Sequence, residues 1–214
     1  MKKDFLFFDL DGTLTESAPG IIRSARYALS HFGMDPDETV MLKFIGPPLL
    51  ESFGSLCGLD EEKSREAIRL YREYFAEKGM FENSVYDGIP ELLEELVNCG
   101  KKLVVATSKP AIFSEKILRH FGIMEYFDFV AGAAMDETRT KKDEVIAYAL
   151  EKCSLSGKTD RILMVGDRKH DVLGAAAHGI DALGVTFGYG SEEELLSAGA
   201  KYIAHTPDEI LKFI

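Results

Sequence analysis

Residues 1–17 of the chain read MKKDFLFFDLDGTLTES, and the stretch from Phe5 to Thr13 decides the fold. Its four apolar residues, Phe5–Phe8, form a run without polar alternation, which predicts a strand buried on both faces. The run ends at Asp9 and Asp11, two carboxylates separated by one residue. Because side chains at i and i+2 of an extended chain point the same way, we expect both carboxylates to face one site.

Short apolar runs followed by helical patterns recur along the rest of the chain. Further strands are predicted within residues 101–108, 127–132, 161–167, 181–188 and, more weakly, 201–205. Several of the helical stretches between them stop at a glycine, as at Gly100 and Gly122. This alternation predicts an α/β fold, a Rossmann-like core with a parallel sheet and helices on both faces.

One segment departs from this alternation. From about residue 17 to residue 84 helical patterns dominate, and no buried strand interrupts them. We therefore expect an α/β core made of residues 1–16 and 85–214, with an inserted all-helical domain at residues 17–84.

Composition and charge narrow the classes of partner and location. The 214 residues include 25 Lys and Arg against 36 Asp and Glu, a formal charge of −11, which disfavours nucleic acid and anionic membranes as partners. The apolar run behind Met1-Lys2-Lys3 is shorter than the roughly 7–15 residues of a signal-peptide core. The three cysteines form no C-x-x-C pair, which fits a reducing compartment, so a cytoplasmic protein is predicted.

The polar residues that follow the predicted strands indicate where chemistry takes place. In an open parallel sheet, ligands bind beyond the carboxyl ends of the strands, where Asp9, Asp11, the pair Thr107-Ser108 and Asp167 would meet. Carboxylates gathered there repel one another unless a cation is present, and Mg²⁺ prefers a few carboxylates together with a substrate phosphate. A magnesium site is therefore predicted, with Asp171 placed to hold waters or a lysine behind it.

Four sequence motifs resemble those of a known family. FDLDGTLTES is similar to the first signature of the haloacid dehalogenase superfamily, and VVATSK resembles the second. Lys141-Lys142 would supply the lysine of the third, and VGDRKHD resembles the fourth. The stretches SAPG, FIGPPL, GDRKHD and FGYGS look most like the phosphoglycolate phosphatase-like branch, whose inserted helical domain is a cap.

This resemblance implies a role for each motif residue. Asp9 would be the nucleophile that forms an aspartyl-phosphate, and Asp11 the acid and base. Mg²⁺ would be bound by Asp9, the main-chain carbonyl of Asp11, and Asp167. The groups expected to contact the substrate are Gly12, Thr13, Thr107, Ser108, the active-site lysine and, in the cap, Gly46.

Some assignments stay open at this point. Lys141 and Lys142 are adjacent on a helix, so only one can point at the site, and comparison with the family pattern favours Lys142. Arg23 and Arg26 are either anion-binding residues or plain surface arginines, and Tyr189 is a weakly supported candidate for the rim of the site.

The leading functional hypothesis is a Mg²⁺-dependent phosphatase of a small phosphate ester, acting as a monomer or homodimer. The ester would be phosphoglycolate-like, or a nucleoside monophosphate or sugar phosphate. A β-phosphoglucomutase-like phosphomutase and a non-catalytic phosphometabolite-binding module are the alternatives. The intact set of Asp9, Asp11, Lys142 and Asp167 argues against the last.

Overall fold

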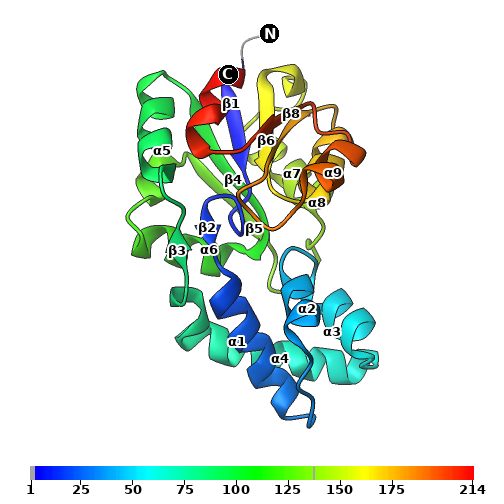
Figure 1. The fold of residues 1–214 in the computed structure, drawn as a ribbon. Helices are drawn as coiled ribbons and strands as arrows, with labels where there is room; N and C mark the ends of the chain where they lie inside the picture. The colour runs from blue at the N-terminus through cyan, green and yellow to red at the C-terminus, as the bar shows by residue number, and fades with distance from the viewer. Residues whose placement is uncertain (1–2, 137) are drawn as a thin grey trace. The chain divides into compact units, whose positions relative to one another are not determined.

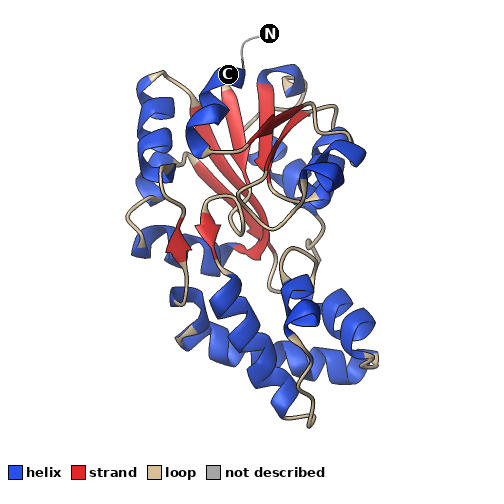
Figure 2. Cartoon of the chain, in the orientation of Figure 1, coloured by secondary structure: helices blue, strands red, loops and turns tan. Residues whose placement is uncertain are grey.

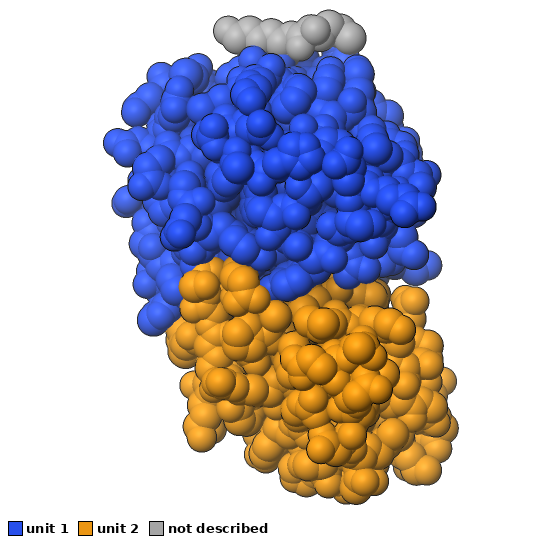
Figure 3. All heavy atoms as spheres, in the orientation of Figure 1, with its two compact units in different colours: residues 1–15, 85–214 blue, residues 16–84 orange. Residues whose placement is uncertain are grey.

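A computed structural model describes residues 3–136 and 138–214 of the chain. Met1 and Lys2, which precede the short apolar run considered above, lie outside the described residues. The chain divides into two compact units, coloured separately in Figure 3. Unit 1 contains the described residues up to Thr15 together with Val85–Ile214, and unit 2 is Glu16–Ser84.

Unit 1 is built on a six-stranded sheet in the order β5-β4-β1-β6-β7-β8 (Figures 1 and 2). Every neighbouring pair is parallel, with β1 in register between β4 and β6. The strands are β1 (Phe5–Phe8), β4 (Lys102–Pro110), β5 (Phe129–Ala133), β6 (Ile162–Gly166), β7 (Asp181–Val185) and β8 (Tyr202–Ala204). Each of the predicted strand segments thus overlaps one strand, although β4 and β5 extend beyond the predicted ends, and the predicted α/β fold with a parallel sheet is confirmed.

Helices cover both faces of this sheet, which explains why its strands are apolar without alternation. On one face, Phe7, Val104 and Met164 pack into a buried cluster with apolar residues of three helices. These helices are α7 (Lys142–Lys152), α8 (Lys169–Ala176) and α9 (Glu192–Ser197). The opposite face carries α5 (Ile89–Asn98) and α6 (Ala111–His120). Short 3₁₀ helices complete the unit: η3 (Met124–Tyr126), η4 (Thr159–Arg161) and η5 (Pro207–Phe213).

Unit 2 is helical, with an aromatic core of its own. Its elements are α1 (Ala18–Ser30), α2 (Glu38–Met41), η1 (Leu42–Phe44), α3 (Leu49–Cys57), α4 (Glu61–Glu77) and η2 (Gly79–Phe81). Phe53 packs edge-on against both Phe44 and Tyr71, at centroid distances of 5.1 and 6.5 Å. Asp60 caps α4 by accepting a hydrogen bond from Lys63 N at 2.9 Å.

One detail differs from the pattern-based expectation. The connecting segments form two very short strands, β2 (Thr15–Glu16) and β3 (Ser84–Val85), which pair in a separate sheet. Two residues are too few to give a period-2 signal, so these strands leave no mark in the sequence. Among the described residues, no helix combines the length and apolar character needed to cross a membrane.

Candidate active site

The carboxyl end of β1 carries the centre of the candidate site. Asp9 follows Phe8 directly, and its backbone N–H donates to the Val165 carbonyl of β6 at 2.9 Å, so the residue is held between two central strands. Its side-chain Oδ1 accepts a hydrogen bond from Leu10 N at 2.8 Å. Asp9 is only 8% exposed, which leaves its carboxylate almost out of bulk water.

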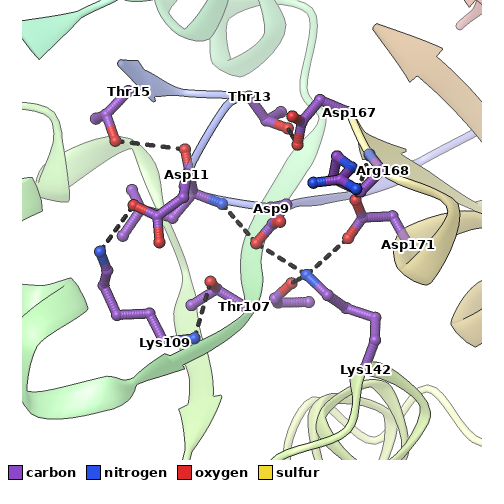
Figure 4. Close-up of polar contacts among 12 residues, drawn as sticks. Asp9, Asp11, Thr13, Thr15, Thr107, Lys109, Lys142, Asp167, Arg168 and Asp171 are labelled. Atoms are coloured by element: carbon purple, nitrogen blue, oxygen red, sulfur yellow. Dashed lines mark hydrogen bonds and ion pairs between the residues drawn. The ribbon is translucent and has the colours of Figure 1, made fainter. Parts of the chain in front are cut away.

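Lys142, the first residue of α7, reaches Asp9 from the neighbouring helix. Its Nζ lies 2.8 Å from Asp9 Oδ1 and 2.7 Å from Asp171 Oδ1, and it donates to the Ala106 carbonyl at 2.9 Å (Figure 4). The side chain of Lys141, in contrast, is exposed at the helix start. Of the two candidate lysines, the structure brings Lys142 to the carboxylates.

Asp171 holds this lysine from behind. It lies in the first turn of α8, where its Oδ2 accepts a hydrogen bond from the backbone N–H of Arg168 at 3.1 Å. With Oδ1 turned to Lys142, both of its oxygens are engaged by the protein. Of the two roles considered from sequence, the geometry favours contact with the lysine.

Asp167 follows β6 and is fully buried. Its Oδ2 accepts a hydrogen bond from Tyr189 N at 2.8 Å, and its Oδ1 lies 3.4 Å from Thr13 Oγ1. Gly12 has a φ of 80°, and a Cβ there would come within 2.2 Å of Asp167 Oδ2. Gly12 therefore permits a close approach to this carboxylate, and its expected contact with the substrate stays a prediction.

Asp11 belongs to a second ion pair. Its Oδ1 lies 2.7 Å from Lys109 Nζ, and the two side chains are 14% and 6% exposed. Lys109 comes from β4, two residues after Thr107, and its backbone N–H donates to Thr107 Oγ1 at 3.2 Å. Sequence reasoning missed Lys109, although it stands at the end of the quoted motif VVATSK.

The cluster of carboxylates is a candidate cation site. Asp9, Asp167 and Asp171 each offer a carboxylate oxygen, and these atoms lie within 4.8 Å of one another. Burial, with the charges of neighbouring aspartates, raises the pKa of Asp167 well above its usual range, and burial also raises the pKa of Asp9 despite the adjacent Lys142. Counting Asp11, four carboxylates face two lysines, so a divalent cation would balance the formal charge. Hard oxygen donors of this kind suit Mg²⁺.

The remaining predicted residues fall into three groups. Thr13 and Thr107 are buried beside the carboxylates, and Ser108 is half-buried next to Thr107 in β4. Gly46 belongs to unit 2 and is not among the residues that unit 1 brings together. Arg23 pairs with Glu82, and Arg26 pairs with Asp35 and Glu38, all within unit 2, which favours the plain surface-arginine interpretation for both.

Comparison with known proteins supports the family resemblance drawn from the four sequence motifs. The family model described as haloacid dehalogenase-like hydrolase matches residues 6–185. A 5'-nucleotidase of Pseudomonas aeruginosa is 48% identical over 191 residues, 89% of this chain and 86% of its own. Tyrosine-protein kinase PtkA of Mycobacterium tuberculosis is 44% identical over 96% of this chain and 70% of its own.

A phosphoglycolate phosphatase of Colwellia psychrerythraea is 29% identical over 98% of this chain and 96% of its own. Among solved structures, a predicted phosphatase from Clostridium acetobutylicum superposes with a TM-score of 0.95 at 47% identity, covering 99% of this chain and 98% of the other.

These matches confirm the resemblance drawn from the four motifs and the expected enzyme class, a phosphoric monoester hydrolase. The matched region contains the DLDGT, ATSK, lysine and GDRKHD motifs, whose residues meet in one buried cluster of unit 1. The chain belongs to the haloacid dehalogenase-like hydrolase family.

Proposed function

We propose that the protein is a Mg²⁺-dependent phosphatase that hydrolyses small phosphomonoesters through an aspartyl-phosphate at Asp9. The observation that carries the proposal is the Asp9 carboxylate, buried at the end of β1 and held by Lys142, with Asp11 two residues further along the chain. The proposed nucleophile, Asp9, and the proposed proton donor, Asp11, are therefore held on the same short stretch of backbone.

In the first half of the reaction, an Asp9 carboxylate oxygen attacks phosphorus, and the bond between phosphorus and the leaving alcohol oxygen breaks. Asp11 supplies the proton that the departing oxygen requires. Lys142, 2.8 Å from Asp9, offsets negative charge as the phosphoryl group approaches the carboxylate. We expect Thr107, with Ser108 beside it, to donate hydrogen bonds to the phosphoryl oxygens.

In the second half, water attacks the phosphorus of the aspartyl-phosphate, and Asp11 takes the proton that this water loses. The acyl–phosphate bond breaks, which releases inorganic phosphate and restores the Asp9 carboxylate. Protonation of Asp11 at the end of this half prepares it to act as an acid again.

Asp9 and Asp167, together with the main-chain carbonyl of Asp11, are the proposed Mg²⁺ ligands. When bound, the ion supplies positive charge that shields the approaching phosphate from the carboxylates. Asp171 is engaged by Lys142 and by Arg168 N, and we assign it to orienting the lysine.

The preferred substrate class is a further part of the proposal. The relative named 5'-nucleotidase is 48% identical and the phosphoglycolate phosphatase 29%, so nucleoside 5'-monophosphates are to be tested first. We propose that unit 2 acts as a cap that selects the substrate, with Gly46, at a φ of 106°, offering backbone amides. The monomeric or homodimeric state and the cytoplasmic location stay predictions.

Phosphate release from a panel of esters tests this proposal. The panel contains nucleoside 5'-monophosphates, 2-phosphoglycolate and sugar phosphates, each with Mg²⁺ or with EDTA, for the wild type and for Asp9→Asn. Release that requires Mg²⁺ and disappears in Asp9→Asn is the expected result. Release that survives in EDTA, or in Asp9→Asn, would contradict the proposal.

The similarity to PtkA favours a second candidate, transfer of the phosphoryl group from Asp9 to a tyrosine hydroxyl instead of water. Incubation with ATP and a tyrosine-containing peptide distinguishes the two. Phosphotyrosine that forms in the wild type and not in Asp9→Asn would favour the transferase, whereas inorganic phosphate alone favours the phosphatase.

A further inference from the structure

We propose that Lys109 is a positioning residue for Asp11, holding the carboxylate that transfers the proton. The inference rests on the proposed function, because it assigns Lys109 to the residue with the acid and base role. It starts from the 2.7 Å ion pair between Lys109 Nζ and Asp11 Oδ1 (Figure 4). Both side chains of this pair are largely buried.

The path of β4 explains how Lys109 reaches this position. In the pairing of β4 with β5, Ala106 lies opposite Ala131 and Pro110 opposite Ala133, so the register shifts between these pairs. The irregularity leaves Thr107, Ser108 and Lys109 outside regular pairing, and Lys109 N turns onto Thr107 Oγ1. A β-bulge of this kind re-aims a side chain, here toward the neighbouring strand β1.

The bulge depends on close backbone packing. A Cβ at Gly132 of β5 would come within 2.7 Å of the Lys109 carbonyl oxygen and 2.5 Å of Ala111 N. Only glycine fits there without displacing the segment that carries Lys109. The position of Lys109 therefore depends on the backbone packing of two strands, β4 and β5.

The two lysines of the site contact different carboxylates. Lys142 contacts Asp9 and Asp171, whereas Lys109 contacts Asp11. Because Lys109 engages one oxygen of Asp11, it limits the rotation of that side chain and leaves the second oxygen for the reacting ester or water. Lys109 thus acts on the reaction through Asp11.

The test compares two esters and a double-mutant cycle. We would measure kcat/KM for a nucleoside 5'-monophosphate and for p-nitrophenyl phosphate in the wild type, Lys109→Met, Asp11→Asn and the double variant. The nucleoside alcohol needs a proton to leave, whereas p-nitrophenolate leaves without one. Lys102→Met is the matched control, because Lys102 lies in the same strand, β4, as Lys109. Its Nζ forms an ion pair with Asp128 Oδ1 at 2.9 Å.

We expect Lys109→Met to lower kcat/KM for the nucleotide by about 10- to 100-fold, and for p-nitrophenyl phosphate by much less. In the Asp11→Asn background, Lys109→Met should have no further effect, because the residue it positions is already disabled. Lys102→Met should match the wild type. Lys109→Arg should recover part of the loss, since a guanidinium also pairs with a carboxylate.

Equal losses for both esters, or a full additional loss in the double variant, would overturn the inference and indicate direct contact of Lys109 with the phosphoryl group. If Lys109→Met does not fold, kcat/KM is compared between Lys109→Arg and Lys109→Gln. Only arginine keeps the ion pair with Asp11, so only Lys109→Gln should show the selective loss for the nucleotide. A wild type that releases phosphate from none of the esters would instead overturn the proposed function, and this inference with it.

Discussion

Replacement of Lys142 by methionine removes the charge at the centre of the site while keeping most of its aliphatic stem. The stem is tightly packed, since a Cβ at Gly174 of α8 would come within 2.8 Å of Lys142 Cγ. The lost contacts are the ion pairs to Asp9 and Asp171 and the hydrogen bond to the Ala106 carbonyl. Asp9 and Asp171 would then be buried without their positive partner.

Breaking a buried ion pair from one side costs about 3–5 kcal/mol, so we expect the free energy of unfolding in EDTA to fall by about that amount. For a chain of this size, 1 kcal/mol corresponds to about 2–4 °C, which gives a drop in Tm of roughly 6–20 °C. Activity with saturating Mg²⁺ should fall by about 10²- to 10³-fold, because Lys142 no longer offsets charge on the phosphoryl group.

The matched control is Lys141→Met, at the exposed neighbouring position. Thermal unfolding by circular dichroism in EDTA, and phosphate release in Mg²⁺, are measured for both variants and the wild type. Lys141→Met should stay within about 0.5 kcal/mol of the wild type and keep its activity. A Lys142→Met variant as stable and active as Lys141→Met would refute the reasoning.

Two further predictions concern the metal and the packing of unit 2. Burial raises the pKa of Asp9 and of Asp167, so their contribution to stability without metal is present at low pH and is lost as the pH rises through the raised values. The gain in Tm on replacing EDTA by Mg²⁺ should therefore be larger near about pH 8 than near about pH 5.5, and an equal or reversed gain would count against a metal at these carboxylates. In unit 2, a Cβ at Gly20 would lie 1.9 Å from the Gly79 carbonyl oxygen, so Gly20→Ala should lower Tm in thermal unfolding. Gly54→Ala, whose Cβ would have no neighbour closer than 3.8 Å, should raise the free energy of unfolding by up to about 1 kcal/mol, and equal effects of the two substitutions would contradict the packing argument.

The sheet and the main carboxylates could be predicted because their signals are local. Apolar runs without alternation marked the buried strands, and two of these runs, β1 and β6, ended at carboxylates of the site, Asp9 and Asp167. The parallel direction of the strands follows from the helices between them, since parallel strands require crossover connections. These parts of the site need no knowledge of distant contacts.

The parts that escaped prediction depend on contacts between distant segments. Lys109 follows Thr107 in an ordinary strand pattern, and only the bulge opposite Gly132 turns it toward Asp11, 98 residues earlier in the chain. The hydrogen bond from Tyr189 N to Asp167 is also a long-range contact that no local pattern encodes. Lys142 could be favoured over Lys141 only by comparison with the family, because periodicity shows that one of them faces the site without showing which.

The C-terminal segment illustrates a smaller limit. Its apolar spacing is helical, yet the segment Pro207–Phe213 is a 3₁₀ helix. At seven residues it is too short for the two helix types to be distinguished by their periods of 3.0 and 3.6 residues.

The central claim is that the phosphoryl group passes through Asp9, and trapping it there is the most direct test. Asp11→Asn is mixed with p-nitrophenyl phosphate and Mg²⁺, quenched in acid, and digested for mass spectrometry. Because this variant lacks the base for hydrolysis while the leaving group needs no acid, we predict a phosphoryl group on the peptide that contains Asp9. Asp9→Asn in the same background should carry none. A peptide that stays unmodified in Asp11→Asn although p-nitrophenol is released, or a label on another residue, would contradict the account.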